Sequence, residues 1–292
     1  MNRSKRTGKA RGRSTGNEPA QSLRKKMERV QKILGQMESV LVAYSGGVDS
    51  TLLLRLAHDE LGERAAALIA SSPTYPQSEI RQAKKIAGEM GVRTVEISTD
   101  ELEIPEFAGN SPRRCYYCKK ELFNLCREKA QELSLKHVAD GTNADDVGDF
   151  RPGMEAAREL DVRSPLQEAG LTKEDIRELS RFLGLPTWDK PSLACLSSRF
   201  PYGTEITLPR LQQVQKAEDY LHGLGFRQLR VRYHGDLARV ELEPAEIHLL
   251  LDEKRRTEVV RSLREAGFAY VTLDLQGYRT GAMNEVLPLR GK

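Results

Sequence analysis

The sequence has few cysteines, a single tryptophan and no long apolar run. Its 292 residues include four cysteines, too few for a disulfide scaffold of this length, so metal binding or catalysis is the better interpretation of them. No stretch approaches the ~20 apolar residues of a membrane span, and residues 2–6 lack the apolar core of a signal peptide. We therefore exclude the membrane, secreted and fibrous classes and expect a cytoplasmic protein.

Positive charge is concentrated at the N-terminus. Residues 1–32 hold eleven lysines and arginines against two glutamates, whereas the whole chain has a net charge of only +4, so the remainder is mildly acidic. A basic segment can contact nucleic acid, but this one is rich in Gly, Ser and Arg and offers nothing to bury. We interpret residues 1–21 as a disordered, solvated tail and do not expect a nucleic-acid partner.

Apolar runs alternate with amphipathic stretches as far as about residue 200. The pattern predicts a helix from about residue 22 to 37, followed by strands at 40–43, 65–69, 94–97 and 137–140 and helices at 51–60, 77–90 and 119–134. Strands that alternate with helices of ten or more residues are typical of βαβ units. We predict an α/β domain at 22–204, built on a doubly wound parallel sheet.

The alternation stops beyond that point. The pattern there predicts a helix at 208–224, a hairpin of 229–233 and 237–242, helices at 246–251 and 256–266, and a strand at 270–273. We predict a smaller α+β domain at 205–292, used for substrate binding or oligomerisation.

The strongest motif is Ser45-Gly46-Gly47-Val48-Asp49-Ser50, between the first strand and its helix. Adjacent glycines let backbone N–H groups approach an anion, the helix N-terminus adds a favourable dipole, and Ser45 and Ser50 add hydroxyl donors. Asp49 has the wrong sign for a phosphate contact, so we expect it to hold a bridging Mg²⁺. A Walker pattern is absent.

This hexapeptide resembles the PP-loop of ATP pyrophosphatases, the adenine nucleotide alpha-hydrolase-like fold. The resemblance implies ATP binding and AMP transfer with release of pyrophosphate. It also places the adenine near Ser71, at the end of the second strand, and the α-phosphate near Gly141, Thr142 and Asn143 after the fourth strand. Both segments lie at strand C-terminal ends, where open α/β sheets bind ligands.

The cysteines have several interpretations from spacing alone. Cys115-Tyr116-Tyr117-Cys118, in a loop just before a helix, suits a redox pair, half of a zinc site or part of an iron–sulfur site. Cys195 lies among small and hydroxyl residues with Arg199 four positions away, a setting that favours a thiolate over simple packing. Cys126 falls in an apolar helical run and is expected in the core.

Five segments together resemble the LarE family of ATP-dependent sulfur transferases, which act in the synthesis of the nickel-pincer cofactor of lactate racemase. They are residues 45–50, 114–119, 148–153, 191–203 and 277–281. The resemblance implies adenylation of pyridinium-3,5-biscarboxylic acid mononucleotide and replacement of its carboxylates by thiocarboxylates. It implies ATP and Mg²⁺ as cofactors, with Asp49 and Cys195 as catalytic residues, and we expect a homo-oligomer.

The family obtains its sulfur in two ways. Members with one cysteine at the position of Cys195 give up its sulfur, whereas members with three cysteines are thought to hold a [4Fe-4S] cluster fed by sulfide or a cysteine desulfurase. The resemblance therefore implies Cys115, Cys118 and Cys195 as cluster ligands, with one iron left open for sulfide. Zinc at these cysteines remains an alternative.

Arginines are the candidates for binding the substrate phosphate. Arg230 and Arg232 alternate on one predicted strand and so share a face, which suits a phosphate as well as it suits a solvated surface. The family resemblance favours phosphate, and Arg199 and Arg279 are further candidates because they lie in matching segments.

Two other functions compete with this hypothesis, a tRNA thiolase of the same superfamily and a non-catalytic adenine-nucleotide-binding module. Removal of residues 1–20 distinguishes the first: it should abolish a tRNA enzyme, which needs the basic tail, and leave a small-molecule enzyme intact. Product formation by the truncated chain measures this. Absence of pyrophosphate release with any acceptor would favour the second.

Overall fold

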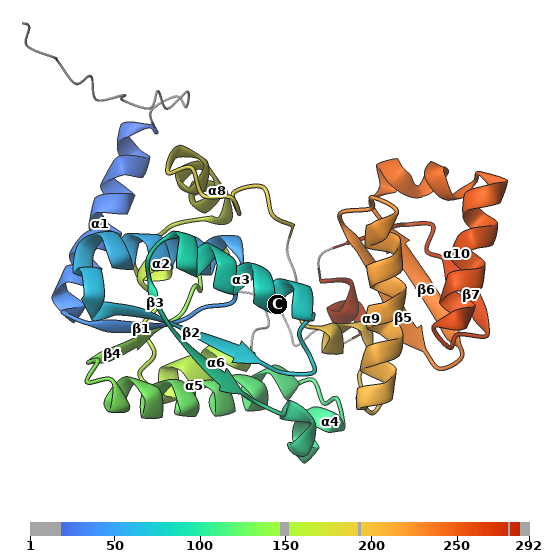
Figure 1. Ribbon diagram of the computed structural model, residues 1–292, viewed down its shortest axis with the longest axis horizontal. Helices are drawn as coiled ribbons and strands as arrows, with labels where there is room; N and C mark the ends of the chain where they lie inside the picture. The colour runs from blue at the N-terminus through green and yellow to red at the C-terminus, as the bar shows by residue number, and fades with distance from the viewer. Residues whose placement is uncertain (1–18, 147–151, 192–193, 280, 287–292) are drawn as a thin grey trace, which may run out of the picture.

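The computed structural model describes residues 19–146, 152–191, 194–279 and 281–286. Within these ranges the chain forms two bodies, each with its own sheet (Figure 1). The basic tail as far as residue 18, and parts of three segments that carry the family resemblance (148–151, 192–193 and 280), lie outside the described residues.

The larger sheet is parallel and has its first strand inside. Its strands are β1 (Val40–Ala43), β2 (Ala65–Ser71), β3 (Arg93–Ser98) and β4 (His137–Ala139), in the spatial order β3-β2-β1-β4. The chain thus runs outward from β1 to β3 and then returns to place β4 on the other side of β1. The crevice between the ends of β1 and β4 is therefore a topological switch point, the usual ligand site of such sheets. The four predicted strands are confirmed.

Helices cover both faces of this sheet, as expected for a doubly wound fold (Figure 1). On one face lie α1 (Gln21–Met37), α2 (Val48–Leu61), α3 (Gln77–Glu89) and α8 (Lys173–Phe182). On the other lie α5 (Arg114–Glu132) and α6 (Pro152–Glu159), while α4 (Pro105–Ala108) and α7 (Pro165–Glu168) are single turns in connections. None of the helices in the described ranges is long and apolar enough to cross a membrane.

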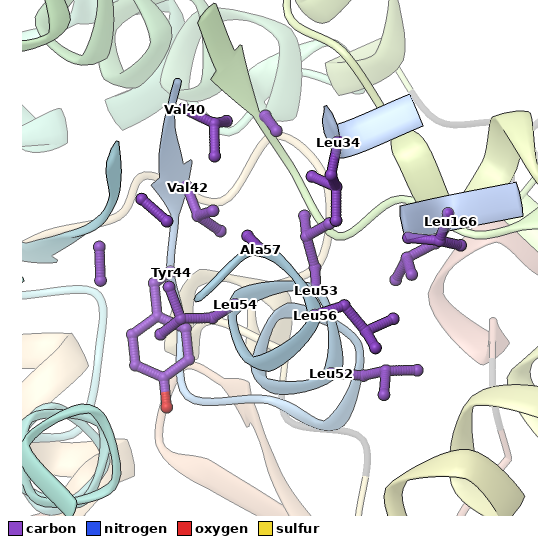
Figure 2. Close-up of a cluster of buried hydrophobic side chains, with 14 of the residues drawn as sticks. Leu34, Val40, Val42, Tyr44, Leu52, Leu53, Leu54, Leu56, Ala57 and Leu166 are labelled. Carbon is purple, nitrogen blue, oxygen red and sulfur yellow. The ribbon is translucent and has the colours of Figure 1, made fainter. Parts of the chain in front are cut away.

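The core under α2 fixes the position of the Gly-Gly motif, residues 45–50. Figure 2 shows Leu53 of α2 directed toward Leu34 of α1, and Leu54 directed toward Val42 of β1; all four side chains are fully buried. Burial of such side chains contributes about 1.5–3 kcal/mol each, so the helix start after Gly47 has little freedom to shift.

The smaller sheet has the order β5-β6-β7. The strands β5 (Leu229–His234) and β6 (Leu237–Leu242) form the predicted antiparallel hairpin, and β7 (Tyr270–Leu273) adds parallel to β6. Helices α9 (Leu208–Gly223) and α10 (Glu253–Glu265) pack in its core. The helix expected at 246–251 is instead a 3₁₀ helix, Pro244–Leu250, a form typical of short connectors.

The second core also takes in side chains from before residue 205. Phe107, Leu196 and Phe200 are buried in it, and Cys118 packs against it. The domain boundary at 204/205 remains a prediction. Two segments that carry cysteines, around Cys118 and Leu196, contact the core of the second body.

Candidate active site

The turn after β1 is built to receive an anion. Gly46 has φ +71°, and a Cβ there would lie 2.7 Å from the Cβ of Ala83 on α3, so only glycine fits. The hydroxyl oxygens of Ser45 and Ser50 lie 3.1 Å apart across the turn. Gly47, the N-cap of α2, makes no side-chain cap, so the first-turn N–H groups and the positive end of the helix dipole remain for a phosphate.

The segment after β4 closes on this turn. A Cβ at Gly141 would lie 2.9 Å from the backbone nitrogen of Ser50, closer than real Cβ atoms come. The Asn143 amide donates to Asp49 Oδ1 (3.3 Å), and the Thr142 hydroxyl donates to Asp140 Oδ2 (2.7 Å). The residues predicted to bind phosphate, which follow β1 and β4, are thus neighbours at the switch point, with the Asp49 carboxylate between them.

Lys173 is a charged member of this site that the sequence analysis missed. Its ammonium forms an ion pair with Asp49, and its backbone N–H donates to Asp145 Oδ2 (2.8 Å). Thr172 and Asp175 form a capping box that starts α8 and fixes Lys173 at the first helical position. That capping pattern is the sequence signal that places Lys173 at a helix start, but nothing local to it points toward Asp49.

Ser71 stands at the C-terminal end of β2, as predicted. Its carbonyl accepts from the Thr99 N–H (3.0 Å), and the next residue, Ser72, exchanges a hydrogen bond with Thr74 (2.7 Å). The loop after β2 is therefore ordered by its own hydroxyls at the same sheet edge as the phosphate loop. This group of residues fits ATP with Mg²⁺. The Gly-Gly turn, the uncapped helix start and the lysine suit the phosphates, and the carboxylate suits the metal.

The Cys-Tyr-Tyr-Cys motif lies inside a helix, not in a loop before one. The helix α5 begins at Arg114, five residues earlier than expected, because Ser111 accepts the Arg114 N–H (3.0 Å) and no glycine or proline follows to interrupt the turn. Cys115 and Cys118 are consequently three residues apart on one helical face.

The three candidate sulfur residues share one electrostatic environment. Desolvation is the main cause that raises the pKa of the Cys118 thiol, and the charges of Glu101 and then Cys195 raise it further. Desolvation and the charge of Cys195 also raise the pKa of Cys115, although this residue is exposed at the surface. Arg114 opposes the shift at Cys115 through its charge and a hydrogen bond. Burial raises the pKa of Tyr75, and the charges of Cys118, Cys195, Glu101 and Cys115 raise it further. Tyr75 therefore lies within electrostatic range of all three cysteines.

Cys126 lies apart from them. It is fully buried under the first sheet with Phe123 and Ala130, and burial raises its pKa to about 12. The prediction that it is a core residue is confirmed.

Cys195 is held from both sides. The next backbone N–H, of Leu196, donates to the Thr74 carbonyl (2.9 Å) in the loop after β2. The Arg199 guanidinium donates to the Cys195 carbonyl (3.0 Å) and forms a buried ion pair with Glu218 on α9 (2.7 Å). Burial disfavours both charges, but the pair outweighs it, so the pKa of Arg199 is raised and that of Glu218 is lowered.

Arg230 and Arg232 do share a face of β5, but that face is buried. Arg232 pairs with Glu241 (2.8 Å) and donates to the Ser198 carbonyl (2.8 Å), which links it to the segment of Cys195. Burial, and next the charge of Arg199, lower the pKa of Arg230 to about 10. Arg199, Arg230 and Arg232 thus form one cationic group, and an anion beside it would relieve its repulsion.

Arg279 is placed differently from that group. It forms an ion pair with the exposed Glu285. Its neighbour Tyr278 lies under the guanidinium of Arg230, 5.0 Å from the ring centre. The predicted phosphate role of Arg279 therefore remains a prediction.

Comparisons with known proteins agree with this geometry. The pattern of the NAD synthase family matches residues 20–108. The chain is 42% identical over 255 residues to the pyridinium-3,5-bisthiocarboxylic acid mononucleotide synthase of Lactiplantibacillus plantarum, a match that covers 87% of this chain and 92% of that protein. An uncharacterized protein of Synechocystis is 44% identical over 91% of this chain and 99% of its own length. A tRNA-specific 2-thiouridylase of Rickettsia africae is 27% identical over about half of each chain (54% and 53%).

The parallel sheet, its Gly-Gly phosphate loop and the NAD synthase match define an enzyme of the ATP-using PP-loop class. Because it is 42% identical to the bisthiocarboxylic acid mononucleotide synthase over most of both chains, the chain belongs to the LarE family. The family expected from the motifs is confirmed.

The contact of Gly141 with Ser50 predicts the effect of a single methyl group. Gly141→Ala should separate the β4 segment from the phosphate loop at a cost of about 1–3 kcal/mol, which weakens ATP binding about tenfold or more. Isothermal titration with a non-hydrolysable ATP analogue measures this. Gly88→Ala on α3, where a Cβ meets nothing within 4 Å, is the matched control and should bind as the unchanged chain does. Equal affinity in both variants would contradict the assignment.

Proposed function

We propose that this protein is an ATP-dependent sulfur transferase that converts pyridinium-3,5-biscarboxylic acid mononucleotide into its bis-thiocarboxylic acid. In each round a substrate carboxylate oxygen attacks the α-phosphorus of ATP and pyrophosphate leaves. Sulfur then attacks the acyl carbon of the mixed anhydride, and AMP leaves with the carboxylate oxygen. The anhydride is needed because a free carboxylate has no good leaving group.

One observation carries the proposal: the cysteine-bearing segment is anchored at the same sheet edge as the phosphate loop. Leu196 bonds to Thr74 after β2, and the loop Ser45–Gly47 follows the neighbouring strand β1. Adenylation and sulfur delivery on one small substrate require this proximity, because the adenylate must meet sulfur before water.

For the first step, the Gly46–Gly47 backbone, Ser45 and Ser50 would bind the phosphates, and Asp49 would hold Mg²⁺ with Asn143 orienting its carboxylate. Mg²⁺ supplies charge neutralisation between the phosphates when bound. Asp49 is paired with Lys173, so metal binding would release this ammonium toward the departing pyrophosphate. Ser71, Gly141 and Thr142 complete the proposed nucleotide site.

For the second step, we propose that Cys115, Cys118 and Cys195 hold a [4Fe-4S] cluster. The set of three thiols with the cationic Arg114 and Lys119 beside Cys115 suits an anionic cluster, which supplies an open iron for sulfide when bound. In the described ranges no three His, Cys, Asp or Glu side chains are grouped to hold one metal ion. A cluster instead spreads its thiolates over separate irons. Sulfide or a cysteine desulfurase would renew the sulfur.

The alternative sulfur source is Cys195 itself. Its thiolate would displace AMP to form a thioester, and loss of the Cα proton with cleavage of the Cβ–S bond would release the thiocarboxylate and leave dehydroalanine. This route gives one sulfur per chain, so the number of turnovers separates the two sources.

We also propose that the cationic group Arg199, Arg230 and Arg232 recognises the substrate phosphate. Arg199 pairs with Glu218 and Arg232 with Glu241, and the Arg232 contact with Ser198 brings the group to the segment of Cys195. We further propose a cytoplasmic homo-oligomer, consistent with the exposed Leu251, Tyr270 and Leu275 of the second body.

The function is tested with the purified chain, MgATP, sulfide and the pyridinium biscarboxylate mononucleotide. Pyrophosphate release that depends on the mononucleotide, together with a thiocarboxylate product in the mass spectrum, is the expected result. Pyrophosphate release without any sulfur-containing product, or none with this acceptor, would reject the proposed function.

Cys118→Ala tests the cluster. After anaerobic reconstitution the unchanged chain should bind about four irons, absorb broadly in the visible range and turn over repeatedly. The variant should lose the iron and the repeated turnover, because one of three cluster ligands is gone. Cys126→Ala changes a buried thiol outside the site and is the matched control. If repeated turnover survives in Cys118→Ala, the cluster role is wrong.

Arg232→Ala tests substrate recognition. Removal of a charged hydrogen-bond donor worth about 1.5–3 kcal/mol should raise the KM for the pyridinium mononucleotide about tenfold or more, while the KM for ATP stays unchanged. Steady-state kinetics with each substrate varied in turn measure the split. The control is Arg227→Ala, an exposed arginine just before β5 whose partner is Asp189. Equal rises in both KM values would remove the phosphate role from Arg232.

A further inference from the structure

Lys190 reaches from the connection that leads to Cys195 onto the phosphate loop. Its ammonium donates to the Gly46 carbonyl (3.1 Å) and to Gln82 Oε1 (2.8 Å), and it forms an ion pair with Glu79 (2.6 Å). Glu79 and Gln82 belong to α3, so one side chain ties the Cys195 connection, the phosphate loop and a helix together. Only 8% of Lys190 is exposed.

The backbone of Lys190 is fixed as well. Its N–H donates to the Thr187 carbonyl (3.0 Å), and its own carbonyl accepts from the Arg177 guanidinium on α8 (2.8 Å). The side chain of Lys190 therefore extends from a backbone position that hydrogen bonds fix at both its N–H and its carbonyl.

The bond to Gly46 acts on the group that receives phosphate. The Gly46 carbonyl and the Gly47 N–H belong to one planar peptide and point in opposite directions. When Lys190 holds the carbonyl, the N–H of Gly47 is directed away from Lys190 within the peptide plane, where it donates to Ser45 Oγ (3.4 Å). Lys190 thus sets the orientation of a phosphate-binding donor from outside the site.

Lys190 and Leu196 restrain the cysteine segment from its two sides. Lys190, five residues before Cys195, anchors it to the turn after β1, and the Leu196 N–H anchors it to Thr74 after β2. Burying an ammonium is unfavourable unless it is paired, and the ion pair with Glu79 supplies that partner. Other lysine pairs on α3 are exposed, for example Lys84 with Glu96.

We propose that Lys190 is a positioning residue that couples the two half-reactions: it aligns the Gly46–Gly47 peptide for adenylation and holds Cys195 within reach of the adenylate that forms there. The inference rests on the proposed function and deepens it. Without Lys190 adenylation is slower, and sulfur is no longer held beside the adenylate that does form, so water hydrolyses a larger share of the anhydride to carboxylate and AMP.

Lys190→Met keeps a flexible, unbranched side chain one atom shorter and removes its charge and hydrogen bonds. The unchanged chain should release about one AMP per thiocarboxylate, and the variant about ten. A role in stability alone would lower both products together and leave their ratio unchanged. Lys84→Met removes an exposed lysine pair from α3, the helix that Lys190 contacts, and should keep the ratio of the unchanged chain. An unchanged ratio in Lys190→Met overturns the coupling role.

A second readout does not need turnover. The iron-free chain is treated with N-ethylmaleimide, and labelling of Cys195 is followed by mass spectrometry. Lys190→Met should label Cys195 several times faster than both the unchanged chain and Lys84→Met, with Cys126 unlabelled throughout. Equal labelling rates would overturn the inference. This readout is separate from the test of the proposed function, which fails if the unchanged chain makes no thiocarboxylate. If Lys190→Met does not fold, Glu79→Gln, which keeps the bond to Gly46, should shift both readouts in the same direction but less.

Discussion

The site depends on the close approach of Gly141 to the first turn of α2. Because a side chain at residue 141 would collide with the backbone of Ser50, the ends of β4 and β1 come together only with glycine there. This contact closes the switch point of the sheet and brings Asn143 to Asp49. The buried leucines of α2 hold the other partner still, so the geometry of the phosphate loop is set by the core beneath it.

Buried ion pairs occur in both bodies near the phosphate loop and the segment of Cys195. Lys190 with Glu79, Arg199 with Glu218 and Arg232 with Glu241 are ion pairs in which at least one member is almost fully buried. Such pairs contribute little net stability, since desolvation offsets most of the attraction, but removing one partner is costly. Their value lies in specificity: each fixes a loop that bears on the phosphate loop or on Cys195.

The sequence predicts the first sheet and its loops well, because β1, α2 and the Gly-Gly turn are local patterns of period and turn chemistry. The start of α5 was misplaced since no cap residue marks it, and the motif Cys115–Cys118 was therefore assigned to a loop. Lys173 and Lys190 were missed for a different reason. Each lies more than 100 positions from its partner, Asp49 or Gly46, and no local pattern records a contact made by the tertiary fold. The alternation of Arg230 and Arg232 also does not predict that they are buried, because the tertiary fold covers both faces of β5.

Under the proposed function, the setting of the cysteines would tie metal binding to the fold. Desolvation raises the pKa of Cys115 and of Cys118 above the ordinary thiol value, which favours the thiol over the thiolate. Under the proposed function, iron would bind the thiolates, and assembly would expel the thiol protons beside the cations Arg114 and Lys119. Cys118 packs on the core of the second body. The Cys195 carbonyl accepts from Arg199, which pairs with Glu218 of α9. Both cysteine segments therefore contact the second body as well as the first.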